Sequence, residues 1–306
     1  MIRVDNIKKN FGDFQALKSV SLEFPKGEIS VVSGADGAGK STLFKIILGL
    51  LKRDSGDIFI NNSIIGNNFS IITEISGYMP ERFSLYPDLT VNENLNFFAD
   101  IYGVGKVKRE ELKKRLLETT GMNRFKNRRA AALSGGMKQK LALSTILLSS
   151  PEVIFLDEPT TGVDPLSRIE FFSIIESLKR EGKTIIMSTP YLDEAEKGDR
   201  IFFLKHGSII KSGKIEEMKR DVPFKIFRLK PKGNVFEIVE NAKNDERLKN
   251  RVFIKGKYLK FISSGEDELI SIIPHTEMKE TIPSLEDIYL YYENIRESVS
   301  ERNGNG

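Results

Sequence analysis

A glycine-rich segment near the start of the chain carries the residue types that bind a polyphosphate. Residues 34–42 read Gly-Ala-Asp-Gly-Ala-Gly-Lys-Ser-Thr, which fits the phosphate-loop pattern of Gly, four residues, Gly-Lys and then Ser or Thr. The backbone N–H groups of such a loop surround the phosphates, the lysine reaches the outer phosphates, and the hydroxyl ligates Mg²⁺. The predicted nucleoside triphosphate site consists of Gly34, Ala35, Asp36, Gly37, Ala38, Gly39, Lys40, Ser41 and Thr42.

A second segment, residues 151–158, ends in two carboxylates suited to phosphate chemistry. A buried strand here would place Asp157 at its carboxyl end, beside the phosphate loop, where it holds Mg²⁺ directly or through water. Glu158 would then align and deprotonate the attacking water as a general base. We therefore expect Ser41 and Asp157 to be the metal ligands and Glu158 to be catalytic. The alternative for this pair is a solvated acidic turn.

The elements around the phosphate loop are those needed to position it. Residues 28–33 read as a short buried strand, and residues 42–48 read as a helix. This order places a helix N-terminus, with its partial positive charge, under the phosphates.

Composition limits the other possibilities. The chain has 306 residues, no cysteine and a net charge of +4, so disulfides and thiolate metal sites are excluded. We find no apolar stretch long enough to cross a bilayer and no N-terminal signal pattern, and we expect a soluble protein made in the cytosol. The basic clusters at 106–115 and 124–129 are most simply solvated helix faces, with Glu110, Glu111 and Leu residues among them. Because they lack the regular aromatic interleaving of a nucleic-acid site, we expect no nucleic-acid partner.

Residues 133–137, Leu-Ser-Gly-Gly-Met, lie between the phosphate loop and the two carboxylates. In this setting the chain resembles the ATP-binding subunits of ABC transporters, whose signature is LSGGQ. The resemblance implies that Ser134, Gly135, Gly136 and Met137 cap ATP held by the phosphate loop of a second subunit. A helix from 137 to 148 would direct its N-terminus at the γ-phosphate.

Further segments match the same family in order, from residue 1 to about 220. Phe11 resembles the aromatic residue that stacks on adenine, although a core phenylalanine is the alternative. Asp164 resembles the acidic residue of the dimer-contact loop. Residues 77–81 resemble the segment that bridges the catalytic core and the membrane domain, and 85–102 the entry to the helical subdomain that docks on the membrane subunit.

Two positions near the expected γ-phosphate depart from the family pattern. Glu81 stands where the family usually has Gln, and an ionised carboxylate cannot donate a hydrogen bond to water. Pro190 stands where the family usually has His, and proline supplies no donor. Tyr191 can substitute only if the backbone turns, because adjacent strand residues point to opposite faces. We expect ATP binding but slow hydrolysis at this subunit's own site, with Glu158 and Glu81 as its catalytic residues.

The C-terminal part reads as a separate small α/β domain at 221–297, after a boundary near residues 221–223. Strands are predicted at 224–229 and 251–262, the latter as a hairpin, and helices at 235–248 and 267–273. A capping box at 284–287 begins a further helix. Residues 281–289 resemble the PSLED segment of drug- and polyketide-exporter ATPases, the type-2 ABC exporters. Dimer contact, regulation or packing are its possible roles, and residues 298–306 should be disordered.

These observations predict an α/β fold. It comprises a P-loop NTPase core (1–220) with an antiparallel β subdomain and a helical subdomain (about 84–150), plus the small C-terminal α/β domain. The resemblance implies an ATPase that uses ATP and Mg²⁺ and drives an ABC exporter. Its partners would be a membrane-spanning permease subunit and a second ATPase subunit, in a homodimer or heterodimer. It would be cytoplasmic and peripheral on the inner face of the membrane. The alternatives are a soluble ABC ATPase with no membrane partner, or a regulatory subunit that binds ATP without hydrolysing it.

Overall fold

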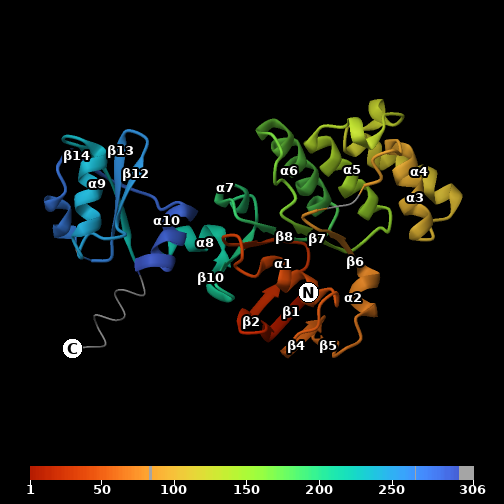
Figure 1. Ribbon diagram of the computed structural model, residues 1–306, viewed down its shortest axis with the longest axis horizontal. Coiled ribbons are helices and arrows are strands. Elements are labelled where there is room, and N and C mark those ends of the chain that lie inside the picture. Colours follow the sequence, from red (N-terminus) through yellow and green to blue (C-terminus); the bar gives the residue numbers. More distant parts are fainter. Residues whose placement is uncertain (83–84, 266, 296–306) are drawn as a thin grey trace. The chain divides into compact units, whose positions relative to one another are not determined.

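The computed structural model describes residues 1–82, 85–265 and 267–295. The chain forms two compact units, Met1–Ile209 and Ile210–Gly306, coloured red to green and green to blue in Figure 1. The division falls inside β10 (Ser208–Lys214), earlier than the boundary expected after residue 220. Helix α8 (Ile215–Arg220) packs against α10 (Leu285–Leu290), and both belong to the second unit. The tail predicted at 298–306 lies outside the described residues.

The first unit is built on a six-stranded sheet with the order β10-β9-β3-β8-β7-β6, in which β3, β6, β7, β8 and β9 are parallel. These parallel strands are β3 (Ile29–Ser33), β6 (Ser76–Met79), β7 (Val153–Asp157), β8 (Thr184–Thr189) and β9 (Arg200–Lys205). Every residue of β3, β7 and β8 is buried, as expected for parallel strands covered on both faces. The predicted strands at 28–33 and 151–158 are therefore confirmed, and their carboxyl ends lie at one edge.

A second, antiparallel sheet has the order β2-β1-β4-β5. It consists of β1 (Ile2–Phe11), β2 (Phe14–Phe24), β4 (Ser55–Ile60) and β5 (Ser63–Ile64). Helix α1 (Lys40–Ile47) follows the phosphate loop, as predicted, and contacts both sheets. Phe44 of α1 and Phe155 of β7 pack edge-to-face with ring centroids 5.5 Å apart, so one apolar core joins the two sheets to the helix.

Helices make up most of the rest of the first unit. Helices α3 (Val91–Ile101), α4 (Lys106–Thr119) and α5 (Gly135–Leu147) form the predicted helical part, with α3 and α4 both contacting α5. The remaining helices are α2 (Ser70–Ile75), α6 (Pro165–Arg180) and α7 (Leu192–Ala195), with short 3-10 turns at Asn123–Phe125 and Ala130–Ala132. None of the helices in the described ranges is long and apolar enough to span a membrane.

The second unit is an antiparallel sheet with the order β12-β13-β11-β14. Its strands are β11 (Lys225–Pro231), β12 (Val252–Lys255), β13 (Tyr258–Ser263) and β14 (His275–Thr281). The predicted hairpin is confirmed, and Gly256 takes the left-handed conformation (φ 60°) at its turn. Strand β14 was not predicted, because its exposed, polar sequence lacks the alternation of a half-buried strand.

Helix α9 (Val235–Asn244) packs against β12 and contributes to the core of this unit. It ends before the predicted residue 248, and the helix predicted at 267–273 is a 3-10 helix over Asp267–Ile272. The predicted capping box is confirmed: Ser284 and Asp287 exchange hydrogen bonds at the start of α10. A π-helical turn, Tyr291–Ile295, follows it.

Candidate functional site

One pocket of about 390 Å³ in the first unit collects most of the residues expected to do chemistry. This volume lies within the range of small-molecule sites. The phosphate loop contributes Asp36, Gly37, Gly39, Lys40, Ser41 and Thr42 to its lining. The rest of the lining is Phe11, Phe14, Ala16, Glu81, Glu158, Thr161, Pro190 and Tyr191. Residues far apart in sequence thus meet where the parallel strands end.

The loop takes its shape from glycines at close approaches. A Cβ atom on Gly34 would lie 2.1 Å from the Leu204 carbonyl oxygen, and one on Gly39 would lie 2.7 Å from the Ala16 carbonyl oxygen. Gly39 also has φ 109°, a conformation that other residues rarely adopt. It precedes α1, so the free N–H groups of that helix begin beside the pocket. Gly34, Ala35 and Ala38 shape the loop without lining the pocket.

Lys40 is buried at the centre of this arrangement. Its Nζ donates to the carbonyl oxygens of Gly34 (2.7 Å) and Ala35 (3.1 Å) and forms an ion pair with Glu158 Oε1 at 3.0 Å. An ammonium group has three hydrogens to donate, and three acceptors therefore surround it.

Glu158 follows β7 and turns into the pocket with a left-handed backbone (φ 49°). Its N–H is held by Ser188, whose carbonyl oxygen lies at 3.2 Å and hydroxyl at 3.0 Å. For residues other than glycine, this backbone conformation is unfavourable in free energy. Such strain concentrates at functional sites. The strand end thus directs the predicted base towards the phosphate loop.

Asp157 is buried (1% exposed) and does not itself line the pocket. Its carboxylate accepts hydrogen bonds from Ser188 Oγ (2.5 Å) and Tyr78 OH (3.2 Å). Burial, and then the charge and hydrogen bond of Asp157, raise the pKa of the Tyr78 phenol far above its ordinary value. Sequence reasoning missed Tyr78 and Ser188. Ser188 was detectable as a polar residue in a buried strand, and it pairs in register with Asp157.

The donor set near the loop fits Mg²⁺. The predicted ligands, Ser41 and Asp157, offer hydroxyl and carboxylate oxygens, which this cation prefers. Within the described ranges, no group of three or more His, Cys, Asp or Glu side chains could hold a metal ion. A cation here would therefore need oxygens from a phosphate as well, which is the usual way that proteins bind Mg²⁺.

The two departures from the family pattern both lie at the pocket. Glu81 is exposed there. Strand β8 ends at Thr189, so Pro190 and Tyr191 both line the pocket and strand alternation does not apply to them. The Tyr191 N–H donates to Thr189 Oγ1 (3.1 Å), and its ring lies 4.9 Å from the Arg168 guanidinium carbon. The backbone turn that Tyr191 requires is therefore present.

Phe11 lies at the rim of the same pocket and is 48% exposed. The amino group of Lys9 lies 5.3 Å from the centre of its ring. The ring therefore stands outside the core, with a face available for stacking.

The predicted signature residues do not line this pocket. Ser134 caps α5 by accepting a hydrogen bond from the Met137 N–H (3.4 Å), and Ser134 and Gly135 are exposed. Asp164 caps α6 by accepting a hydrogen bond from the Ser167 N–H (3.0 Å). The Ser167 hydroxyl, and then this N–H, lower the pKa of the Asp164 carboxyl group. The chain thus presents a second capped helix start outside the pocket of its own phosphate loop.

A phosphate loop beside an acidic strand end, joined to an antiparallel sheet and a helical part, defines the ATP-binding cassette of P-loop proteins. The family model described as "ABC transporter" matches residues 17–161. The chain belongs to the ABC transporter family, as an ATP-binding protein of that family.

Relatives and solved structures agree with this assignment. The chain is 32% identical to the Nod factor export ATP-binding protein I of a Rhizobium species, covering 94% of this chain and 95% of that one. It is 34% identical to the probable multidrug ABC transporter ATP-binding protein YbhF of Escherichia coli over 95% of its length, but it spans about half (51%) of that relative.

Among solved structures, one is similar with a TM-score of 0.62 and 29% identity, over 70% of this chain and 98% of that one. Its description is a dimeric post-hydrolysis state of an ATP-binding cassette bound to ADP and Pi. A cassette in the ADP conformation gives a TM-score of 0.63 and 29% identity, over 71% and 92% of the two chains.

Proposed function

We propose that this chain is the ATP-binding and ATP-hydrolysing subunit of an exporter. The observation that carries the proposal is the single pocket that gathers the phosphate loop, Glu158 and Phe11. The loop amides and Lys40 match the charge of a triphosphate, Phe11 offers a face to the base, and Glu158 is a base at the outer end. ATP is the nucleotide bound by relatives of this name and fold.

Hydrolysis requires in-line attack of a water on the γ-phosphorus. Glu158 accepts the proton of that water, and Lys40 and the amides at the start of α1 stabilise the charge on the phosphate oxygens. Asp157 and Ser41 would hold Mg²⁺, and Ser188 and Tyr78 fix the carboxylate of Asp157 in place. Mg²⁺, when bound, offsets the negative charge of the phosphates.

A second ATPase subunit completes the site in this proposal. The exposed start of α5, with Ser134 and Gly135, is free to face the phosphates of a partner's nucleotide. The similar dimeric cassette bound to ADP and Pi supports paired cassettes. Asp164 then belongs to the dimer contact. The partner is a copy of this chain or a related subunit.

Transport is the work that we assign to this ATPase. The relatives carry names of export and drug transport, such as the Nod factor export protein and the linearmycin resistance protein LnrL of Bacillus subtilis. A separate membrane-spanning permease subunit would hold the protein on the inner, cytoplasmic face of the membrane. Residues 77–81 and the helical part would then dock on that permease.

Glu81 and Pro190 favour a second candidate, a subunit that binds ATP and hydrolyses it slowly or not at all. Both line the pocket, and neither gives the donor usually found there. Tyr191 lies beside Pro190 with a phenol that can donate. The balance between the two candidates therefore depends on whether this phenol reaches the γ-phosphate.

The test measures binding and turnover separately on the purified chain. A fluorescent ATP analogue should bind in the presence of Mg²⁺, and the Lys40→Ala variant should lose that binding. Phosphate release above that of Lys40→Ala supports the hydrolysing subunit. Binding without release supports the regulatory candidate, and a chain that binds no nucleotide contradicts both.

A further inference from the structure

Strand β14 leaves one side of the second unit's sheet open. It pairs with β11, and among the described residues no strand pairs with its other side. Residues 276–280 are all exposed. Such an edge presents free N–H and C=O groups, and it pairs with a further strand unless charges or bends prevent it.

The charges on this edge are unevenly matched. Glu277 lies opposite Lys230 of β11 and forms an ion pair with it at 2.8 Å. Lys279, on the same face, lies opposite Arg228, and like charges facing each other are unfavourable. Lys279 forms no ion pair within the part of the chain that the structure describes. The edge therefore has a lysine that a carboxylate from outside would stabilise.

A copy of the same strand supplies that carboxylate in one register only. Only alternate residues of an edge strand direct their N–H and C=O groups outward, so facing residues must be an even number of positions apart. An antiparallel pair centred on Glu277 sets two glutamates against each other, and one centred on Lys279 sets two lysines. The pair centred on Met278 sets Glu277 against Lys279 twice.

We propose that β14 pairs antiparallel with β14 of a second copy of this chain, centred on Met278. Glu277 then lies between Lys230 of its own chain and Lys279 of the other copy. Met278 is 53% exposed and packs on its counterpart. The irregularity in the β11–β14 ladder falls before Glu277, so the three central residues keep regular strand geometry.

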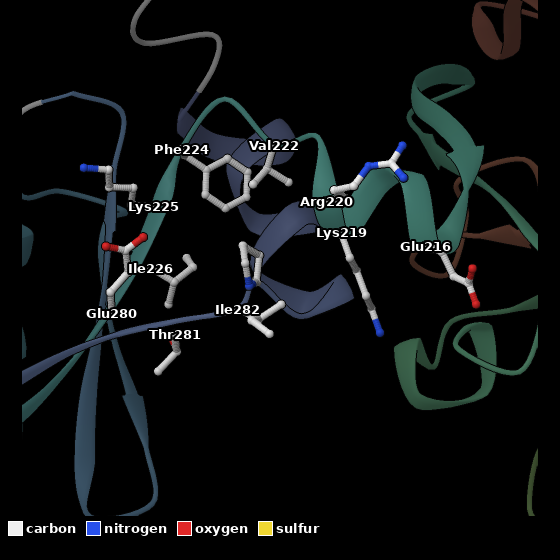
Figure 2. Close-up of a pocket in the computed structure, with 11 residues that line it drawn as sticks. Glu216, Lys219, Arg220, Val222, Phe224, Lys225, Ile226, Glu280, Thr281 and Ile282 are labelled. Atoms are coloured by element: carbon white, nitrogen blue, oxygen red, sulfur yellow. The ribbon is translucent and has the colours of Figure 1, made fainter.

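A pocket of about 770 Å³ lies at the Thr281 end of this edge. Figure 2 shows Glu280, Thr281 and Ile282 along one side of it, with Phe224 and Lys219 on the others. Ile282 is 85% exposed. In an antiparallel pair, the residues before Glu277 of the second copy lie beside the Thr281 end of this copy. They would therefore cover Ile282.

Cross-linking tests the register, because the chain contains no cysteine. The full-length Met278→Cys protein, treated with a short bis-maleimide without nucleotide, should form covalent dimers. The control is Ile254→Cys, in β12 at the opposite edge of the same sheet and 40% exposed. A dimer yield for Met278→Cys no higher than that of the control overturns the proposal.

Charge reversal tests the pairing itself in the Met278→Cys background. In the Lys279→Glu variant, glutamates face each other twice between the two copies. Within the chain, the new glutamate lies opposite Arg228 and attracts it, so the unit should still fold. We expect roughly tenfold less dimer, and adding Glu277→Lys should restore it. The proposed pairing is contradicted if the dimer yield of Lys279→Glu is unchanged, or if the double variant does not recover it. Either result would support an edge whose charges block association.

These measurements need no nucleotide, so they are independent of the proposed ATPase. If cross-linking fails while the fluorescent ATP analogue binds, only the β14 pairing is lost. If cross-linking succeeds and the analogue does not bind, only the proposed function is lost.

Discussion

The buried ion pair between Lys40 and Glu158 joins a phosphate-binding group to a predicted base. The Glu158→Gln variant distinguishes phosphate binding by Lys40 from base catalysis by Glu158, because the amide keeps the shape of the side chain but is not a base. Turnover should fall by about 10²–10⁴-fold, the usual contribution of a general base. Affinity for ATP should not fall, since Lys40 is freed for the phosphates. Phosphate-release assays and titration with a fluorescent ATP analogue measure the two effects, and an equal loss of both would contradict the assignment.

Glu81 and Pro190 are the residues that we expect to slow the site. Replacing them together, Glu81→Gln with Pro190→His, restores the donors usual in the family and should raise turnover at saturating ATP. The control is Tyr191→Phe, which removes the neighbouring phenol. If it lowers turnover in the native background, Tyr191 already supplies a donor. If the double replacement gives no gain in rate, these two positions do not explain slow hydrolysis.

Tyr78 links the acidic strand end to the pH dependence of stability. Its pKa is raised in the folded chain, chiefly by burial and then by Asp157, whereas an unfolded tyrosine ionises near pH ~10. The contribution of Tyr78 to the free energy of unfolding is therefore fully present below pH ~10. It is lost as the pH rises further, because the unfolded chain releases the phenol proton first. Thermal melts between neutral and strongly alkaline pH should show a smaller loss for Tyr78→Phe. An equal loss in both proteins would exclude this contribution.

At the scale of elements, the start of α5 depends on its contact with α6. A Cβ atom on Gly136 would lie 2.3 Å from Ser167 Cβ, whereas one on Gly135 would meet its nearest atom, the Gly162 carbonyl oxygen, at 3.4 Å. Gly136 therefore has a packing role besides the one implied by the family signature.

The matched variants Gly136→Ala and Gly135→Ala separate these roles. Gly136→Ala should destabilise the protein by about 1–3 kcal/mol, the usual cost of overpacking, and Gly135→Ala should be nearly neutral. Adding Ser167→Gly to Gly136→Ala removes the clashing atoms and should recover much of the loss. Chemical denaturation measures all of these. Equal stability of the two alanine variants would show that the helices separate without cost.

The sequence predicted the elements that carry strong local signals. The glycine spacing and apolar flanks gave the strand before Gly34 and the helix after Lys40, and the capping box gave the start of α10. It did not predict β14, whose residues are polar except for Met278 and are exposed on both faces between its two half-buried ends. Nor did it predict that Tyr78 and Ser188 hold Asp157, because such contacts depend on the order of strands in the sheet.

At the scale of the whole molecule, the described residues include two apolar cores that lie in different units. The first surrounds α1 and both sheets of the first unit, and the second lies within the C-terminal sheet and α9. The boundary at residues 221–223 and the strand and helix signals after it predicted a C-terminal domain. The point of division, however, depends on which contacts α8 makes, and these are not local.

Separate cores predict separable effects of core mutations. Phe261 is fully buried in the second core and Phe44 in the first. Phe261→Ala should destabilise the C-terminal unit by about 3–5 kcal/mol and leave binding of the ATP analogue unchanged. Phe44→Ala should impair that binding. Calorimetry with nucleotide titration tests both, and a loss of binding in Phe261→Ala would show that the units depend on each other.

The three hydrogens of Lys40 are already engaged by Gly34, Ala35 and Glu158. A phosphate that binds Lys40 must therefore compete with oxygen atoms of the chain itself for the ammonium group. Binding of a phosphate by Lys40 would then weaken the ion pair that holds Glu158, the residue that we propose as the base. On the proposed roles, Lys40 would thus couple nucleotide binding to the release of the base.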